Sequence, residues 1–213
     1  MARPLTIWRT PTSATAVELD DATLALAAAS GDHDAHTAIW DRYSGLVRQI
    51  LVRGLGAHAD VEDRVQEVFI RFYRSRKSLR DPAALRSFLF GITLRVAATE
   101  LRRRRMRSWL RLTQRGVLKE VEAPAADEQA RQAVRRLYQI LDRVDTTSRF
   151  ALVLHTIEGW DLAETATAMG ISVSSVKRRL SRTFPRVVAA AKADSVLALY
   201  LPSEHPCSRK SER

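Results

Sequence analysis

Eight basic side chains lie in residues 100–119, the stretch ELRRRRMRSWLRLTQRGVLK, and the only acid there is Glu100. From Arg102 to Lys119 every charged side chain is positive. The guanidinium of arginine is a planar fork of donors that matches the oxygens of a phosphate and stacks on nucleic-acid bases. This run therefore indicates contact with a polyanion, and nucleic acid is the commonest polyanion.

The composition of the whole chain agrees with the run. The 213 residues include 35 Lys and Arg against 24 Asp and Glu, so the formal net charge is +11, and 30 of the basic residues are Arg. Hydrophobic residues make up 46%, which is enough for a folded core. A nucleic-acid partner is the first hypothesis, and a positive surface that only confers solubility is the alternative.

The number of cysteines and the lack of a long apolar stretch indicate the cellular compartment of the protein. Cys207 is the only cysteine, so no disulfide can form within one chain, which suits a reducing cytoplasm. The N-terminal residues lack the apolar run of a signal peptide. No stretch approaches the ~18 apolar residues of a membrane span. We expect a cytoplasmic protein without a membrane partner.

A second group of chemically active side chains is acidic. The stretch DVEDRVQEVFIRFYRSR, from Asp60 to Arg76, is expected to be helical. At about 100° per residue its apolar residues form one stripe and four polar residues gather on another face. The stripe is Val61, Val65, Val68, Phe69 and Phe72, and the polar face is Glu62, Asp63, Gln66 and Glu67 with Ile70 among them.

Two further helices position these groups. Residues 21–55 have a helical pattern that Gly54 and Gly56 end. Asp81-Pro82 is typical of a helix start, and the helix that follows is apolar on two sides, so it belongs in the centre of its domain. Its stripes are Leu85, Phe88, Leu89, Ile92 and Val96 on one side and Phe90, Leu94 and Leu101 on the other.

A switch in charge separates two modules. After the positive run, the charges from Glu120 to Glu128 are all negative and Pro124 interrupts them, which is typical of a linker. No alternating strand pattern occurs in the sequence. We therefore predict an all-α fold of two small helical modules joined by a linker. The segments are a tail at 1–22, a module at 23–106, a linker at 107–128, a module at 129–193 and a tail at 194–213.

The second module ends in a helix-turn-helix pattern, LAETATAMGISVSSVKRRLSR. Ala166 is small where two helices approach, Gly170 suits the turn, and Ser172 can cap the second helix. The exposed face of that helix would present Ser174, Ser175, Lys177, Arg178, Arg179 and Arg182, with no acid from Gly170 to Arg186. Such a face suits base edges and phosphates of DNA, and an αα-hairpin with a basic exposed face is the alternative.

The two modules together resemble bacterial sigma factors of the extracytoplasmic-function group. The resemblance covers about residues 31–190 and lies in five motifs that occur in order. These are GDHDAHTAIWDRY, DVEDRVQEVFIRFYR, LRSFLFGI, the arginine run and GISVSSVKRRLSR. It identifies the first module with sigma region 2 and the second with sigma region 4.

The resemblance implies a function: to bind core RNA polymerase, direct it to a promoter and help open the duplex. The acidic helix is the family's polymerase-binding element, which carries over to Glu62, Asp63, Gln66, Glu67 and Ile70. Carboxylates on one exposed face suit a basic helical partner. Members of the family are often bound by an anti-sigma factor, which is a further candidate partner here.

Promoter DNA is the implied partner of the remaining motifs. The loop at about Ser78 to Ala84 matches the family's loop that captures a flipped base of the minus-ten element. Arg80, Arg86 and Arg95 would line the groove for the strand, and Arg102, Arg103, Arg104 and Arg105 would follow its phosphates. Phe88 is either a wedge between bases or part of the core. The basic face from Ser174 to Arg182 would contact the minus-thirty-five element.

Two other classes of function remain as alternatives. One is a helix-turn-helix regulator that binds DNA without polymerase, which leaves the acidic face without a purpose. The other is an enzyme, for which His33 and His36 beside Asp32 and Asp34 are the best candidate metal site. No further His or Cys cluster supports such a site. We expect no catalytic activity and no cofactor.

Overall fold

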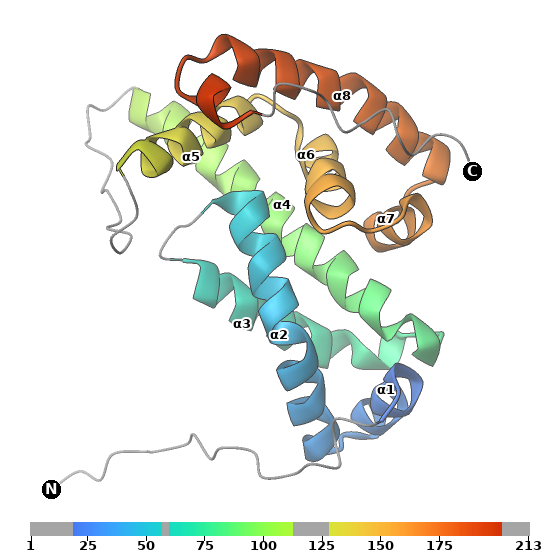
Figure 1. The fold of residues 1–213 in the computed structure, drawn as a ribbon. Coiled ribbons are helices and arrows are strands. Elements are labelled where there is room, and N and C mark those ends of the chain that lie inside the picture. Colours follow the sequence, from blue (N-terminus) through green and yellow to red (C-terminus); the bar gives the residue numbers. More distant parts are fainter. Residues whose placement is uncertain (1–18, 57–59, 113–127, 202–213) are drawn as a thin grey trace, which may run out of the picture.

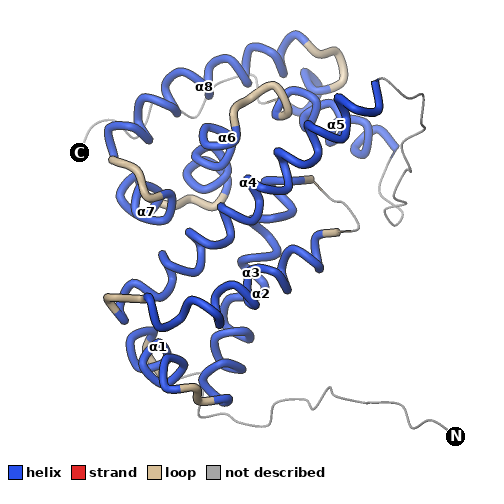
Figure 2. The backbone as a smooth tube through the Cα atoms, turned by 180° about the vertical axis from the view of Figure 1, so that it is seen from behind, coloured by secondary structure: helices blue, strands red, loops and turns tan. Residues whose placement is uncertain are grey.

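The computed structural model describes residues 19–56, 60–112 and 128–201, without the side chains of 108–112, and confirms the all-α prediction (Figures 1 and 2). In these ranges the helices of the N-terminal half are α1 (Asp21–Ser30), α2 (His33–Leu55), α3 (Val61–Ser75), the short turns η1 (Arg76–Ser78) and η2 (Pro82–Ala84), and α4 (Leu85–Leu112). Those of the C-terminal half are α5 (Glu128–Leu141), α6 (Thr146–Leu152) with its continuation η3 (Val153–Ile157), α7 (Leu162–Met169), α8 (Val173–Ala193) and η4 (Leu197–Tyr200).

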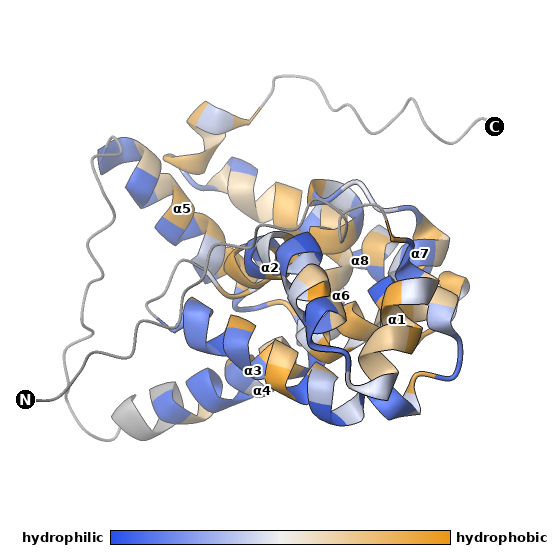
Figure 3. Ribbon diagram, turned by 90° about the horizontal axis from the view of Figure 1, so that it is seen from below, coloured by the Kyte–Doolittle hydropathy of each residue, from blue (hydrophilic) through white to orange (hydrophobic). Residues whose placement is uncertain are grey.

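Helix α4 runs through the middle of the molecule (Figure 1). It contacts α1, α2 and α3 on one side and α6 and α7 on the other. Seen from below, α1 is coloured mainly apolar, while α3 and the far part of α4 carry hydrophilic segments (Figure 3). The prediction of a central helix with two apolar sides is therefore confirmed in its packing.

The core of the first module contains the stripe expected on α3. All five residues of that stripe are buried, and Phe69 and Phe72 are among the largest side chains that solvent does not reach. From α4, Leu89 and Phe90 join the same core. The core continues into the second module through Phe150 and other residues of α6, η3 and α7, which the sequence pattern did not predict.

The helical run expected over residues 21–55 breaks into α1 and α2. Gly31 has φ 97°, and its N–H donates to the carbonyls of Ala27 and Ala28, which ends α1. Asp32 then caps α2, because its side chain accepts the N–H groups of Asp34 and Ala35. The expectation of one continuous helix was wrong here, since a left-handed glycine next to an N-cap residue makes two helices more stable than one.

Two predicted boundaries also differ from the helices observed. Helix α4 continues to Leu112, past residue 107, where the linker was expected to start. The tail expected from residue 194 begins with an ordered turn, η4, in which Leu197 packs on Ala191 of α8 and Ala133 of α5. The expected N-terminal tail up to residue 18 and the middle of the linker lie outside the described residues.

The helix-turn-helix forms as the sequence predicted. Asp161 and Glu164 make a capping box at the start of α7, and Gly170 ends that helix with φ 64°. Ser172 caps α8 by accepting the N–H of Ser175, and Val176 is buried behind the exposed face. These caps fix the direction of α8, and thereby the direction in which its basic face points.

Truncation of two neighbouring residues of α3 should change the free energy of unfolding by very different amounts. Phe69 is 2% exposed and Ile70 is 49% exposed. Phe69→Ala is expected to lower the free energy of unfolding by about 3–5 kcal/mol, because it leaves a cavity in the core. Ile70→Ala should change it by no more than roughly 0.5 kcal/mol. Urea unfolding followed by circular dichroism measures both, and equal effects would contradict the packing of α3.

Candidate nucleic-acid and partner interfaces

The outer face of α3 presents most of the residues expected to bind a partner. Glu62, Asp63, Gln66 and Ile70 are exposed, whereas Glu67 is half-buried on the side next to α4. The buried stripe behind them fixes the helix, so these four side chains point away from the core together. The structure therefore brings the predicted polar face together, with Glu67 at its edge.

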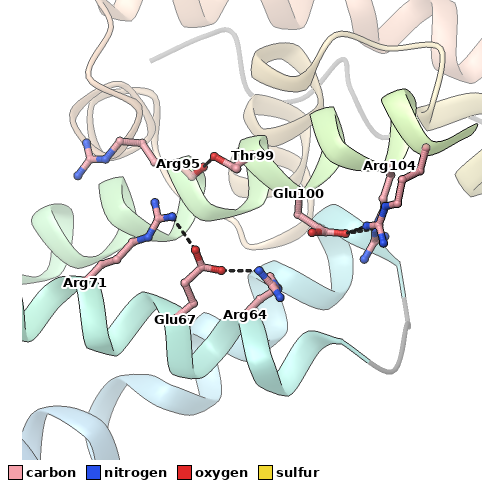
Figure 4. A network of polar contacts seen from close by, with 8 residues as sticks. Arg64, Glu67, Arg71, Arg95, Thr99, Glu100 and Arg104 are labelled. Carbon is pink, nitrogen blue, oxygen red and sulfur yellow. Dashed lines mark hydrogen bonds and ion pairs between the residues drawn. The ribbon is translucent and has the colours of Figure 1, made fainter. Parts of the chain in front are cut away.

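Arginines pair with two of the three acids on this face. Arg48 of α2 donates from Nε and Nη2 to the two carboxylate oxygens of Glu62, at 2.7 Å each, and this guanidinium lowers the pKa of Glu62 below its ordinary value. Glu67 lies between Arg64 and Arg71, each at 2.5 Å (Figure 4). The i,i+3 and i,i+4 spacing could have predicted the Glu67 pairs, but nothing in the sequence pointed to Arg48.

The loop before α4 has a fixed shape. The side chain of Asp81 accepts the N–H of Ala83 at 3.0 Å and so caps η2. Arg80 and Arg95 are exposed, and in the close view Arg95 points away from the ion pairs of α3 (Figure 4). Phe88 is half-buried and meets the ring of Phe72 edge-on, with centroids 6.2 Å apart. It thus packs on the core and borders the surface.

A cleft of about 560 Å³ separates this loop from the second module. The loop and α4 form one wall, to which Arg80, Phe88 and Arg95 contribute. The start of α6 and the end of α7 form the other, with Thr146 and Met169. The groove expected for a single strand therefore faces the helix-turn-helix in this arrangement.

The arginine run divides into two classes. Arg102, Arg103 and Arg105 are exposed. Arg104 is half-buried, because its Nε donates to Glu100 at 2.9 Å and its Nη1 to the carbonyl of Leu55 at 2.8 Å.

Glu100, 3% exposed, also accepts from Arg107 at 2.8 Å. Arg105 donates to the carbonyl of Val144 in the second module, also at 2.8 Å. In this arrangement Arg102 and Arg103 present their charge outward, whereas Arg104 fastens α4 to the end of α2. The acid that opens the run, Glu100, serves as its internal counterion.

The basic face of α8 is open to solvent. Ser174, Lys177, Arg178 and Arg182 are exposed, and Ser175 and Arg179 are half-buried. Arg179 lies 3.3 Å from Asp145, the N-cap of α6. Burial acts to raise the pKa of Asp145, but hydrogen bonds from Ser148 and the charge of Arg179 outweigh it and lower that pKa.

The residues of the candidate metal site have other contacts. Asp32 caps α2, and Nε2 of His36 lies 3.2 Å from the carbonyl oxygen of Ala28. Within residues 19–56, 60–112 and 128–201, no group of three or more His, Cys, Asp or Glu side chains is arranged to bind a metal ion. These contacts give Asp32 and His36 a role in joining α1 to α2.

Comparison with known proteins identifies both modules. The model of sigma-70 region 2 matches residues 39–107, and the model of sigma-70 region 4 matches residues 134–184. The RNA polymerase sigma factor CnrH of Cupriavidus metallidurans is 30% identical over 82% of this chain and 96% of its own length. This chain belongs to the extracytoplasmic-function sigma factors.

A second sigma factor and a solved structure agree with this assignment. The ferric citrate uptake sigma factor FecI of Escherichia coli K12 is 29% identical over 68% of this chain and 84% of its own length. The structure of CnrH in complex with the cytosolic domain of CnrY matches this chain with 29% identity and a TM-score of 0.59. The match covers 82% of this chain and 99% of the chain in that structure. The protein is therefore a DNA-binding factor of transcription initiation.

A helix that spans a bilayer needs about 20 predominantly apolar residues in succession. Among the residues that the structure describes, none forms a helix both long and apolar enough to cross a membrane.

Adjacent arginines of the run should behave differently when truncated. Arg103→Ala should reduce the slope of log affinity against log salt by about 0.9 on duplex DNA, because one fewer phosphate is neutralised, without changing stability. Arg104→Ala should instead lower the free energy of unfolding by about 1–3 kcal/mol, because Glu100 and the Leu55 carbonyl are deprived of a charged donor. Salt titration of DNA binding and urea unfolding measure these effects, and the reverse pattern would refute the division.

Proposed function

We propose that this sigma factor binds core RNA polymerase through the outer face of α3, places it on a promoter and stabilises the opened strand. The observation that carries the proposal is the juxtaposition on one rigid helix of Asp63, Gln66 and Ile70, all exposed, over a fully buried stripe. A solvated face does not require an isoleucine that is 49% exposed. A partner that supplies a basic and partly apolar helix accounts for both the polar and the apolar member.

The ion pairs of the free chain indicate which acids contribute most to the attraction of a basic partner. Glu62 and Glu67 already have arginine partners in the free chain, so a basic partner must compete with those arginines. Asp63 lies between them on the exposed face. We therefore expect Asp63 to dominate the attraction, because an acid without a strong internal counterion interacts most with an incoming positive charge.

Promoter contacts follow from the two basic surfaces. The N-terminal turns of α8 present Ser174, Lys177 and Arg178 where a recognition helix meets base edges, and Arg182 lies one turn further along. The loop around Asp81 and the exposed Arg80 and Arg95 border a cleft that suits an unstacked base and its phosphates. The first surface would choose the minus-thirty-five element, and the second would open the minus-ten element.

An anti-sigma protein is a further proposed partner. In a solved structure CnrH is in complex with the cytosolic domain of CnrY, and that CnrH chain matches 82% of the present chain. The likeness extends over both modules, so a regulator that contacts both is compatible with this fold.

Reversing the charge of Asp63 tests polymerase binding. Asp63→Lys is expected to weaken binding to core polymerase at least about tenfold, because it places a cation against a basic partner, and tenfold corresponds to ~1.4 kcal/mol. Glu128→Lys makes the same charge change in the first turn of α5, outside this face, and is the control. Titration of labelled protein with core polymerase, followed by fluorescence polarisation, measures both. Equal affinity of Asp63→Lys and Glu128→Lys for core polymerase would exclude this face as the binding surface. That result is the one expected for a helix-turn-helix regulator that acts without polymerase.

The loop before α4 is tested by separating opening from binding. Arg80→Ala with Asp81→Ala should slow duplex opening at least about tenfold. Unstacking a base costs a few kcal/mol, and the altered pocket would offset less of that free energy. A promoter with a pre-melted bubble should restore activity. Arg102→Ala with Arg103→Ala should impair both templates, since phosphate contacts act before and after opening. Permanganate footprinting reports opening, and a loop variant that opens duplex at the normal rate would exclude the loop.

A further inference from the structure

Two arginines at the cleft beside the loop before α4 differ from their neighbours in their ion pairs. Arg80 and Arg95 both line the cleft and are exposed. Neither has an ion-pair partner among the residues that the structure describes. By contrast, Arg86 of the same region pairs with Glu164 at 2.9 Å. The positive charge at the cleft is therefore available to an anion from outside the chain.

Gly91 determines where the guanidinium of Arg95 lies. A Cβ at residue 91 would be 3.7 Å from Nη1 and 3.9 Å from Nη2 of Arg95, so the guanidinium covers the glycine one turn back along α4. Figure 4 shows the same direction, because Arg95 extends away from Thr99. The same Cβ would be 3.5 Å from the carbonyl oxygen of Ala168, near the end of α7. The guanidinium of Arg95 thus lies inside the cleft, close to both of its walls.

The rest of the lining combines apolar surface with hydrogen-bonding groups. Phe88 of α4 and Met169 of α7 are apolar. Thr146 and Thr147 add hydroxyls from α6, and Asp81 adds a carboxylate from the loop. A nucleobase has apolar faces and hydrogen-bonding edges, so such a lining suits it. A fatty acyl chain would leave the same polar groups without partners.

The size and charge of the cleft restrict the ligand further. Its volume of about 560 Å³ lies within the ~300–1,000 Å³ typical of small-molecule sites. Two arginines against one acid leave the charged lining positive. The planar fork of a guanidinium matches the oxygens of a phosphate group, and two such forks match a diphosphate. A small molecule with a base at one end and phosphates at the other meets all of these requirements.

We propose that the cleft binds a nucleoside diphosphate in the free chain. Arg80 and Arg95 bind the phosphates, and the base lies against Phe88 and Met169. The ligand occupies the surface that the proposed function assigns to an unstacked base, so nucleotide and promoter strand compete for one cleft. This competition rests on the proposed function, whereas the nucleotide site does not. The sigma factor thereby becomes sensitive to the concentration of a free nucleotide.

Removal of one guanidinium tests the phosphate contacts. Arg80→Ala and Arg95→Ala should each weaken binding of ADP at least about tenfold, as expected for the loss of one charge-assisted hydrogen bond. Both side chains are exposed, so the fold should be retained. Arg74→Ala removes the same charge from an exposed position of α3 that does not line the cleft, and it should bind ADP as wild type does.

A second pair of variants tests the wall that the second module contributes. Thr147 of α6 lines the cleft, whereas Thr156 is exposed in the same module and does not line it. Thr147→Glu places an acid beside the phosphates and should weaken ADP binding at least about tenfold. Thr156→Glu makes the same change in charge outside the cleft and should match wild type. Arginines acting alone on an open surface would not distinguish these two variants.

Isothermal titration calorimetry of the full-length proteins measures all five affinities. ADP should bind to wild-type protein at one site per chain. Adenosine and inorganic pyrophosphate carry the two halves of the ligand separately, and each should bind at least about tenfold more weakly than ADP. Circular dichroism of each variant establishes that the helices are retained.

Three results would overturn the nucleotide site. One is the absence of ADP binding to wild-type protein at concentrations up to about 1 mM. Another is equal affinity for ADP and pyrophosphate, because the base then contributes nothing. The third is equal weakening by Arg80→Ala and Arg74→Ala, because the cleft then has no special role.

Competition with DNA is measured on the same free protein. ADP should displace a fluorescein-labelled single-stranded DNA of mixed sequence, which lowers its fluorescence polarisation. Binding of ADP without displacement would contradict the shared use of the cleft. The permanganate test of the loop variant decides the placement of the strand independently. Normal opening by that variant, together with ADP binding at the cleft, would contradict the proposed function and leave the nucleotide site in place.

Discussion

The burial of α4 on two sides is the constraint on which the rest of this sigma factor depends. Leu89 and its neighbours complete the core that positions α3, so the face proposed to bind polymerase is only as rigid as this packing. Phe90 and Gly91 face the second module, where Trp160 and the carbonyl of Ala168 meet them. One helix thus positions the outer face of α3, borders the cleft beside the loop at Asp81 and contacts the second module.

Internal charge pairing decides which of the many ionic side chains are available to partners. Glu100 is buried and pairs with both Arg104 and Arg107, so it offsets one of the positive charges of the run. Arg48 does the same for Glu62. A charge that already has an ion-pair partner in the free chain attracts an incoming partner less strongly. The residues left exposed, such as Asp63 and Arg103, are therefore the best candidates for intermolecular contact.

Sequence predicted what depends on local periodicity. The stripe of α3, the two apolar sides of α4 and the turn at Gly170 follow from spacings of three and four residues or from one glycine, and the structure contains all of them. The sequence pattern did not predict the break at Gly31. There the spacing of apolar residues continues, but Gly31 ends α1 and Asp32 caps the start of α2. Nor did the sequence predict the pair of Arg86 with Glu164, because the two residues are 78 positions apart and no periodic signal links them. Contacts between modules depend on tertiary packing, and a single sequence holds little information about them.

The central claim is that the outer face of α3 is the surface that contacts core RNA polymerase. A photo-crosslinking side chain tests this directly when it replaces Ile70, which is 49% exposed on that face, or Leu26 of α1, which is 61% exposed outside it. With core polymerase added to the full-length protein, the chain labelled at position 70 should form a covalent adduct, and the chain labelled at position 26 should not. No adduct from position 70, or equal adducts from both positions, would contradict the account.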